Sequence, residues 1–413
     1  MSNGAGGQHA ITKIWNAKLS NEPGWSHIEI VDGTIASLTT SNTLADAPEA
    51  PGQLNAAGRV VLPGLIDAHT HIDKNFSPVA NTAGTLAGAI EAMAEYKQQR
   101  TLVEVSAKAE QALQQAISHG VCLLRSHFDL GSFSDLDILA ALVDLKERYQ
   151  NRIDLHITAM GPTETRDNII LMREALALGA DYIGGVPALT GNPFQAINHA
   201  VELALELDKG LDLHIDEKEG TEFLTLEMLA DLCLACNFQL PVVASHCVSL
   251  AFLPEAARDA LIEKVVAANI AIIGLPVCNL NLMSRQLWPA ARGITPIKRL
   301  QQLGATVCVA SDNVQDPFNP FGNYDPLLAS HIACIAGQLT ATEELHNAVD
   351  LVTNNPAKAF ALANYGIAPG NPASLVITNA ESYEHCNRTL PARLATVFKG
   401  NLVYQKEIIE HWF

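Results

Sequence analysis

Basic residues are scarce in this sequence. Its 413 residues include 26 Lys and Arg against 44 Asp and Glu, which gives a formal net charge of −18 at pH 7. A surface this acidic repels the phosphate backbone of nucleic acids and the headgroups of an anionic membrane. We therefore expect neither a nucleic acid nor a membrane among the partners of this protein.

The sequence also lacks long apolar runs and a recognisable leader. No apolar run is long enough to span a bilayer, and the first ten residues, MSNGAGGQHA, contain neither a basic segment nor an apolar one. Eight cysteines are scattered between residues 122 and 386. Without a secretory signal, these cysteines are expected to be the reduced thiols of a cytoplasmic protein.

What the sequence does contain is a repeated alternation of apolar segments and helical patterns. Eight short apolar segments are separated by stretches with apolar residues at helical spacing, as in residues 101–118 and 255–268. This alternation predicts a (β/α)8 TIM barrel of the α/β class over residues 63–365. The eight expected strands are residues 60–69, 121–130, 154–160, 181–189, 211–217, 241–247, 270–277 and 305–313.

Both ends of the chain have strand patterns without intervening helices. Residues 26–38 alternate like two strands with a tight turn at Asp32–Gly33, and a strand pattern returns in residues 373–380. The simplest interpretation is that the C-terminal segment rejoins the N-terminal one. We therefore predict a small, discontinuous β-sandwich domain formed by residues 1–62 and 366–413.

Polar side chains stand where four of the predicted barrel strands end. In a parallel barrel these carboxyl ends form the active site, and residues i and i+2 of one strand point to the same side. A lone His-x-His pair is a weak signal. However, imidazoles and a carboxylate converging from four strands predict a divalent-metal site with nitrogen and oxygen ligands. The residues are His69 and His71 on the first strand, His214 on the fifth, His246 on the sixth and Asp312 on the eighth.

These motifs resemble those of the amidohydrolase superfamily. The resemblance rests on PGLIDAHTH at residues 63–71, the strand-end histidines and aspartate, and NNPAKAFAL at residues 354–362 followed by GIAPGNPASLVI at residues 366–377. It covers nearly the whole chain. Within the superfamily, LHIDE at residues 213–217 and SDNVQDPFNPFG at residues 311–322 resemble the branch of the cytosine deaminases and N-isopropylammelide isopropylaminohydrolases.

The resemblance implies one divalent metal ion per chain, zinc or alternatively iron(II). His69, His71, His214 and Asp312 are the implied ligands. Two-metal members bridge their ions with a carboxylated lysine at the end of the fourth strand, and residues 181–193 contain no lysine. His246 is then expected beside the metal-bound water rather than on the metal.

The expected activity is that of a metal-dependent hydrolase of carbon–nitrogen bonds in cyclic amidines, which deaminates a pyrimidine-like or triazine-like heterocycle. A bound ion lowers the pKa of its water from 15.7 to about 7, and the resulting hydroxide attacks the ring carbon that bears the amino group. Asp312 is expected to accept a proton from the water and His246 to stabilise the developing charge. Glu217 is expected to protonate a ring nitrogen and then the leaving amine.

Lys74 and Asn313 are the candidate substrate-binding residues. Lys74 follows His71 by three residues and either donates to a substrate carbonyl or carboxylate or is a solvated loop lysine. Asn313 stands where cytosine deaminases carry a second acidic residue. Residues 157–168 lack the glutamine with which those enzymes read the amide edge of the pyrimidine. The substrate is therefore expected to differ from cytosine.

Several alternatives stay open on the sequence. One is a ring-opening hydrolase of cyclic amides, against which the missing fourth-strand lysine counts. Another is a catalytically silent metal-binding barrel, against which the joint presence of Glu217, His246 and Asp312 counts. His127 and Asp129, at the end of the second strand, either orient metal ligands or pack at the barrel mouth. The expected partners are a small heterocyclic substrate and further copies of the chain in a homo-oligomer.

Overall fold

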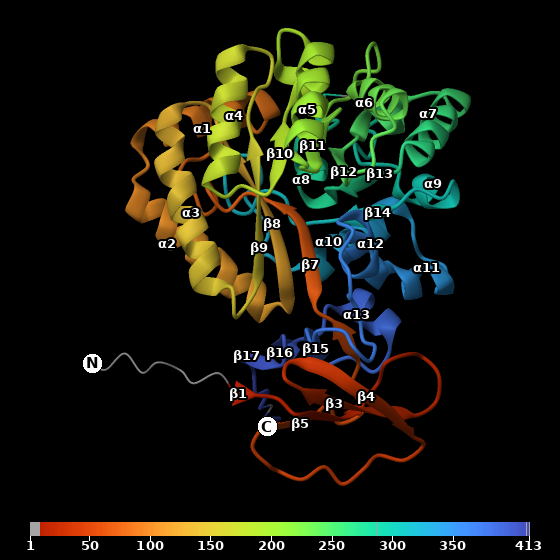
Figure 1. Cartoon of the computed structure of the whole chain (residues 1–413). Helices are drawn as coiled ribbons and strands as arrows, with labels where there is room; N and C mark the ends of the chain where they lie inside the picture. The colour runs from red at the N-terminus through yellow and green to blue at the C-terminus, as the bar shows by residue number, and fades with distance from the viewer. Residues whose placement is uncertain (1–8, 287, 410, 413) are drawn as a thin grey trace.

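The computed structural model describes residues 9–286, 288–409 and 411–412. A barrel of strands surrounded by helices forms one part, and sheets built from both ends of the chain lie beneath it (Figure 1). The first eight residues, where no leader is expected, lie outside the described residues. None of the described helices combines the length and the hydrophobicity that are needed to cross a membrane.

The barrel has the predicted architecture. Its eight parallel strands neighbour each other in chain order, and a bridge between Thr70 and Asp312 joins the last strand to the first. The prediction of a (β/α)8 barrel is thus confirmed. The strands are β7 (Leu65–Thr70), β8 (Val121–Asp129), β9 (Asp154–Met160), β10 (Tyr182–Gly185), β11 (Leu211–Ile215), β12 (Val242–His246), β13 (Ile270–Gly274) and β14 (Val307–Val309).

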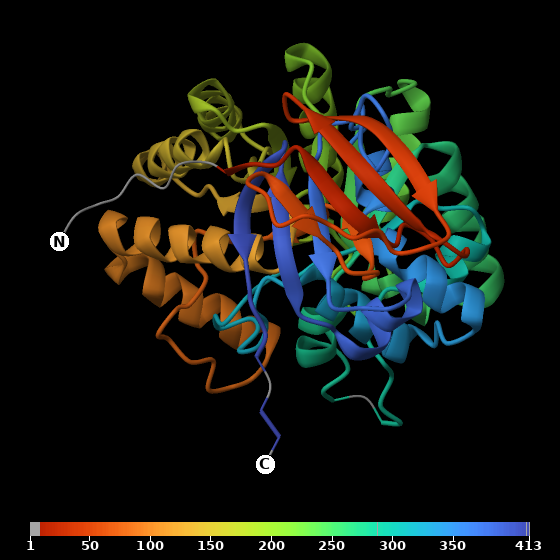
Figure 2. The same cartoon turned by 90° about the horizontal axis from the view of Figure 1, so that it is seen from below.

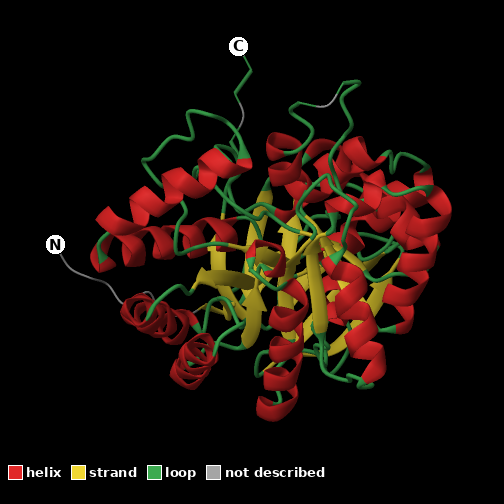
Figure 3. Cartoon of the chain, turned by 90° about the horizontal axis from the view of Figure 1, so that it is seen from above, coloured by secondary structure: helices red, strands yellow, loops and turns green. Residues whose placement is uncertain are grey.

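Helices surround the strands on the outside (Figure 3). They bury one apolar face each against the barrel, as Val105, Ala109 and Leu113 of α2 do. Between successive strands lie α1 (Leu86–Gln99), α2 (Leu102–Ser118), α3 (Leu136–Tyr149), α4 (Arg166–Leu178), α5 (Pro193–Leu207), α6 (Thr225–Ala235), α7 (Glu255–Ala267), α8 (Pro276–Leu282) and α9 (Ile297–Gln302). After β14 follow α10 (Pro326–Gly337), α11 (Thr342–Asn347), α12 (Asn354–Ala359) and α13 (Tyr383–Thr389).

Threonine caps define the helical pair that separates β7 from β8. The side chain of Thr85 accepts a hydrogen bond from the backbone N–H of Gly88 at the start of α1, and Thr101 accepts one from Glu104 at the start of α2. Such caps satisfy N–H groups that have no partner within the helix. The pair places α1 above the mouth of the barrel, where it contributes to the functional site described below.

Two further sheets lie below the barrel (Figures 1 and 2). Apolar side chains such as Ile14, Ile28 and Val397 form a separate core between them. One sheet has the order β1 (His9–Ala10), β17 (Asn401–Gln405), β16 (Arg393–Phe398), β15 (Leu375–Thr378) and β6 (Val61–Pro63). The other has the order β4 (Thr34–Ser41), β3 (Trp25–Val31), β2 (Lys13–Ala17) and β5 (Gln53–Asn55).

The turn between β3 and β4 is the predicted hairpin. Asp32 and Gly33 have φ values of 48° and 75°, which suits the mirror-image turns that join twisted strands. A Cβ atom at Gly33 would lie 2.5 Å from the carbonyl oxygen of Lys399. Close approach of the two terminal segments therefore requires glycine at this position.

The first predicted barrel strand is wrong in one respect. Residues 60–69 form two strands, because β6 pairs with β15 below the barrel while β7 pairs with β8 inside it. The change of partner occurs at Gly64, whose N–H donates to Ser374, whereas the N–H of the next residue, Leu65, donates to Gly120. A Cβ atom at Gly64 would lie 2.4 Å from the sulfur of Cys122, so only glycine fits where the chain passes from one sheet to the other.

Candidate metal and active site

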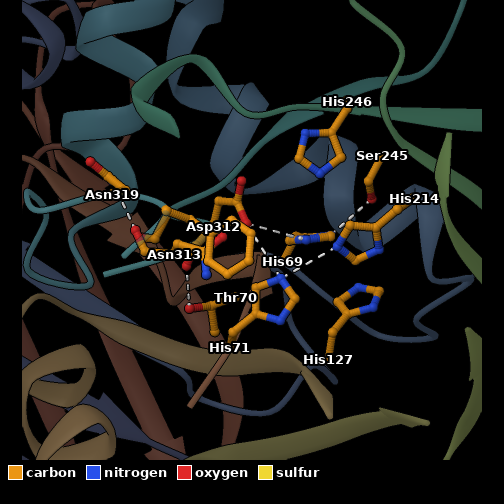
Figure 4. A network of polar contacts seen from close by, with 12 residues as sticks. His69, Thr70, His71, His127, His214, Ser245, His246, Asp312, Asn313 and Asn319 are labelled. Carbon is orange, nitrogen blue, oxygen red and sulfur yellow. Dashed lines mark hydrogen bonds and ion pairs between the residues drawn. The ribbon is translucent and has the colours of Figure 1, made fainter. Parts of the chain in front are cut away.

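The four predicted metal ligands converge at the mouth of the barrel (Figure 4). His69 and His71 stand at the end of β7, His214 on β11 and Asp312 just beyond β14. The Oδ1 atom of Asp312 lies 3.4 Å from Nε2 of His71 and 3.6 Å from Nε2 of His69. Nε2 of His214 lies 3.4 Å from Nε2 of His71. Ligands arranged tetrahedrally at about 2.1 Å from an ion are separated by about 3.4 Å, so these spacings suit one.

Several buried polar atoms of this cluster have no hydrogen-bond partner. Both carboxylate oxygens of Asp312 and Nε2 of His69 are buried without a hydrogen-bond partner. Burial raises the pKa of Asp312 to about 7, and it lowers the pKa values of His69, His71 and His214 well below their usual range. Neutral imidazoles beside an unsatisfied carboxylate are what a divalent cation requires. These residues therefore fit a divalent metal ion.

The backbone of Asp312 is clamped to β7. Its N–H donates to the carbonyl of His69 over 2.8 Å, and its own carbonyl accepts from the hydroxyl of Thr70 over 2.7 Å. The preceding N–H, of Ser311, donates to the carboxylate of Asp67 over 3.0 Å. Asp312 adopts a left-handed conformation with φ of 58°. The contacts that join the last strand to the first therefore also fix the position of Asp312.

His246 lies beside the predicted ligands without joining them. It ends β12 with a left-handed φ of 69°, and its ring centre is 5.1 Å from that of His214. Its Nδ1 lies 3.1 Å from Nδ2 of Asn279 and 3.5 Å from Oε1 of Glu217. Among the described residues, two groups offer ligand atoms close enough to hold a metal ion. One is His69, His71 and Asp312, the other is His69, His127 and His214, and neither includes His246. Its imidazole lines the cavity described below.

Glu217 is a buried carboxyl group next to the cluster. Burial is the main cause that raises its pKa to about 8, and the nearby carboxylate of Asp312 raises it further. A glutamic acid with this pKa is protonated at neutral pH. It can therefore act as a proton donor where an ordinary glutamate could not.

A cavity of about 330 Å³ opens above the cluster. Its polar lining consists of Lys74, Lys97, Asp129, Glu217, His246 and Asn313, together with His71 and His214 of the cluster. The rest of the lining is mainly apolar. A cavity of this size and mixed lining suits a small ring-shaped ligand. Its apolar wall consists of Leu86, Ile90 and Met93 of α1 with Leu130, Met160, Val186, Leu189 and Phe318.

Lys74 is buried in the wall of this cavity, so the alternative of a solvated loop lysine is wrong. Its side chain is 4% exposed, and its Nζ donates to both carboxylate oxygens of Asp129 at 3.2 Å. Lys97 of α1 reaches the same carboxylate at 2.6 Å. Burial opposes the charge of Lys74, but Asp129 and Asp73 outweigh that effect and raise its pKa.

Asn313 also lines the cavity, and a neighbouring carboxylate fixes its orientation. Its Nδ2 donates to Oδ2 of Asp316 over 2.5 Å, and its carbonyl accepts from Asn319. Asp316 is buried and was not identified from the sequence. Asp316 does not line this cavity, whereas Asn313 does.

The two strand-2 residues differ in what they contact. The ring centre of His127 lies 4.0 Å from that of His69, and its Nε2 lies 3.4 Å from Oδ1 of Asp212. Asp129 instead joins Lys74 and Lys97 in the cavity wall. His127 therefore packs against a candidate ligand, whereas Asp129 faces the space for the substrate.

Sequence reasoning missed some of the residues that shape this site. Lys97 is an ordinary helical lysine in the sequence, and only the position of α1 brings it to the cavity. Phe318 lies within the motif at residues 311–322, but nothing in that motif shows that its ring faces the cavity. No local signal marks Asn279 as the partner of His246.

Comparisons with known proteins agree with this geometry. The family model described as "Amidohydrolase family" matches residues 86–404. A pterin deaminase from Rhizobium rhizogenes is 30% identical over 86% of this chain and 82% of its own length. An N-isopropylammelide isopropyl amidohydrolase from Pseudomonas sp. is 25% identical over 96% of this chain and 98% of its own.

A solved structure extends the similarity to the whole fold. The 5-methylcytosine deaminase from Klebsiella pneumoniae, liganded with phosphonocytosine, is 28% identical to this chain with a TM-score of 0.92. The similarity covers 97% of this chain and 100% of that one. The N-isopropylammelide isopropylaminohydrolase from Burkholderia multivorans is 25% identical with a TM-score of 0.83, over 95% and 98% of the two chains.

Proposed function

This chain belongs to the amidohydrolase family, and we propose that it deaminates an amino-substituted nitrogen heterocycle. One observation carries the proposal. His71 and His214, two of the predicted metal ligands, border one cavity of small-ring size together with Glu217, whose pKa is raised, and the buried Lys74. The relatives named above, which act on a pterin, on N-isopropylammelide and on 5-methylcytosine, support a ring of this kind.

The resident metal ion belongs to the same proposal. His69, His71, His214 and Asp312 would hold it, and three imidazoles with one carboxylate favour zinc, with iron(II) as the alternative. When bound, such an ion lowers the pKa of a coordinated water from 15.7 to about 7 and so supplies a nucleophile at neutral pH. The absence of a lysine in β10 and the loop after it supports a single ion.

Glu217 and Asp312 would transfer the protons of the reaction. Glu217 is protonated at neutral pH and can give its proton to a ring nitrogen, which makes the adjacent carbon more electrophilic. Asp312 can take a proton from the attacking water. The hydroxyl group added to the ring carbon can then give its proton to Glu217, which passes it to the amino group. Ammonia leaves as the carbonyl forms, and the proton held by Asp312 restores Glu217. His246 would stabilise the charge that develops on the attacked carbon's substituents.

Lys74, Asn313 and the apolar wall would position the ring. An ammonium group held against Asp129 presents a donor to a carbonyl oxygen of the substrate. Leu86, Ile90 and Phe318 offer apolar surface to the faces of the ring. At the end of β9, Met160 borders the cavity, and its thioether cannot read an amide edge as a glutamine does. This favours a substrate other than cytosine.

Location and assembly complete the proposal. All eight cysteines are free thiols, which supports a reducing compartment such as the cytoplasm. The active protein is proposed to be a homo-oligomer. The proposed partner of the cavity is a small heterocyclic substrate.

The direct test is release of ammonia by the purified, zinc-loaded protein from a panel of aminopyrimidines, aminotriazines and pterins. Mass spectrometry of the product distinguishes exchange of an amino group for oxygen from the addition of water that accompanies ring opening. Exchange with ammonia release supports the proposal. Addition of water without ammonia would favour the cyclic-amide hydrolase, and no turnover across the panel would favour a silent metal-binding barrel. Glu217→Gln serves as the matched inactive control.

A further inference from the structure

A chain of buried polar side chains lies behind His69, on the side away from the cavity. The Nδ1 atom of His69 lies 2.9 Å from the hydroxyl of Ser245 on β12. That hydroxyl lies 3.5 Å from Oδ1 of Asp212 on β11. His69, Ser245 and Asp212 are all completely buried. Neither Ser245 nor Asp212 is among the described residues that line the cavity, so neither can touch a substrate there.

Arg125 of β8 keeps Asp212 charged. Its Nη1 donates to Oδ2 of Asp212 over 2.8 Å. The guanidinium is clamped between two rings, with its central carbon 3.3 Å from the ring centre of Phe360 and 3.7 Å from that of Tyr182. An arginine is always charged, so a buried carboxyl group that it contacts at this distance is held as the carboxylate. A carboxylate can only accept hydrogen bonds.

The direction of the hydrogen bonds follows from that charge. The hydroxyl of Ser245 donates its single proton to the carboxylate of Asp212, so its oxygen is left to accept. The partner that remains is Nδ1 of His69, which must then carry the proton. The other nitrogen of this ring, Nε2, keeps its lone pair and lies 3.6 Å from Oδ1 of Asp312. This is the tautomer and the orientation that a metal ligand requires.

We propose that Asp212 and Ser245 are positioning residues that hold His69 as a metal ligand through a carboxylate–hydroxyl–imidazole chain. The inference rests on the proposed function, because it concerns the same metal site. It goes beyond it by assigning a role to residues that touch neither the cavity nor the ion. A purely structural role, in which Arg125 and Asp212 only stabilise the barrel, makes a different prediction for metal affinity.

The test measures cobalt(II) binding to the full-length, metal-free protein by chelator competition and visible absorption. Ser245→Ala deletes only the hydroxyl that orders His69. The expected result is a rise of about 10- to 100-fold in the cobalt dissociation constant, with altered visible bands. Ser330→Ala is the matched control, since Ser330 of α10 is also completely buried but donates to the carbonyl of Ala348, away from the site. It should bind cobalt like the wild type.

Two further variants separate positioning from stability. Ser245→Thr keeps the hydroxyl and should bind cobalt more tightly than Ser245→Ala. Asp212→Asn should weaken cobalt binding, whereas Asp325→Asn, which breaks a buried pair with Arg393, should lower the unfolding temperature without changing the cobalt spectrum. If Asp212→Asn does not fold, the serine variants decide the question.

The possible failures are distinguishable. If the wild type binds no cobalt, the proposed metal site and function fall, and the inference with them. If the wild type binds cobalt and Ser245→Ala binds it as tightly as Ser330→Ala does, the inference alone is overturned.

Discussion

The ammonium nitrogen of Lys74 lies 3.2 Å from both carboxylate oxygens of Asp129, inside the wall of the candidate active site. The two residues come from the ends of neighbouring barrel strands, β7 and β8. A lysine this deeply buried keeps its charge only because a carboxylate compensates for the lost hydration. The pair therefore places a cationic donor in the lining of the cavity, next to His71, and the carboxylate of Asp129 holds it there.

Lys74→Met is expected to lower kcat/KM without changing the metal content of the protein. Loss of one hydrogen bond from a charged donor costs about 1.5–3 kcal/mol, or roughly ten- to a hundredfold in kcat/KM. Steady-state kinetics combined with elemental analysis check this. The control is Lys146→Met, because Lys146 pairs with Asp181 far from the cavity. Wild-type kinetics in Lys74→Met would remove this lysine from substrate binding.

The protein reconstituted with excess zinc is expected to retain about one equivalent per chain after removal of loosely bound metal. Asp312→Asn should lose most of it, because this substitution removes the only carboxylate among the proposed ligands. Asp316→Asn changes another buried carboxylate four residues further on and should retain the ion. Elemental analysis decides the matter, and two tightly held ions with a mass consistent with a carboxylated lysine would contradict the single-metal arrangement.

The activity is expected to have an alkaline limb set by Glu217. Its pKa is raised to about 8, so the carboxyl group is protonated below that pH and loses its proton as the pH rises through it. As the protonated form is the proton donor, kcat/KM should fall above about pH 8. Glu217→Gln should reduce kcat by about 10²- to 10⁴-fold with unchanged metal content. A flat profile through that range would separate Glu217 from proton transfer.

Cytosine is expected to be a poor substrate. The side chain of Met160 borders the cavity at the end of β9, in the segment where cytosine deaminases carry a glutamine that reads the amide edge of the pyrimidine. If the amide edge of bound cytosine finds no hydrogen-bond partner in a closed site, the loss of binding free energy is large. Measured turnover of cytosine with kcat/KM above roughly 10⁵ M⁻¹s⁻¹ would be that of an efficient enzyme and would refute this expectation.

Much of the barrel and of the candidate metal site could be predicted from the sequence, because the signals are local or follow from a topological rule. Buried parallel strands are continuous apolar runs, and each of the eight barrel strands overlaps the segment predicted for it, although the first segment also contains β6 of another sheet. The rule that catalytic groups stand at the carboxyl ends of barrel strands then selected His69, His71, His214, His246 and Asp312. The resemblance to the amidohydrolases set His246 apart from the four implied ligands. Glu217 and Lys74 became candidates because each follows a strand-end histidine by three residues and because the surrounding motifs resemble those of the cytosine deaminase branch.

Only the tertiary structure decided how these groups are supported. No pattern in residues 60–69 shows that the chain changes sheets at Gly64, since that depends on Ser374 and Gly120 offering carbonyls on either side. Likewise, Ser245 meets His69 across 176 residues and Arg125 meets Asp212 across 87 residues. Strand sequences specify which way a side chain points, but its partner depends on the register in which separate strands dock. The burial and charge of Lys74, Asp212 and Glu217 arise from that docking, because neighbouring groups from distant segments determine both.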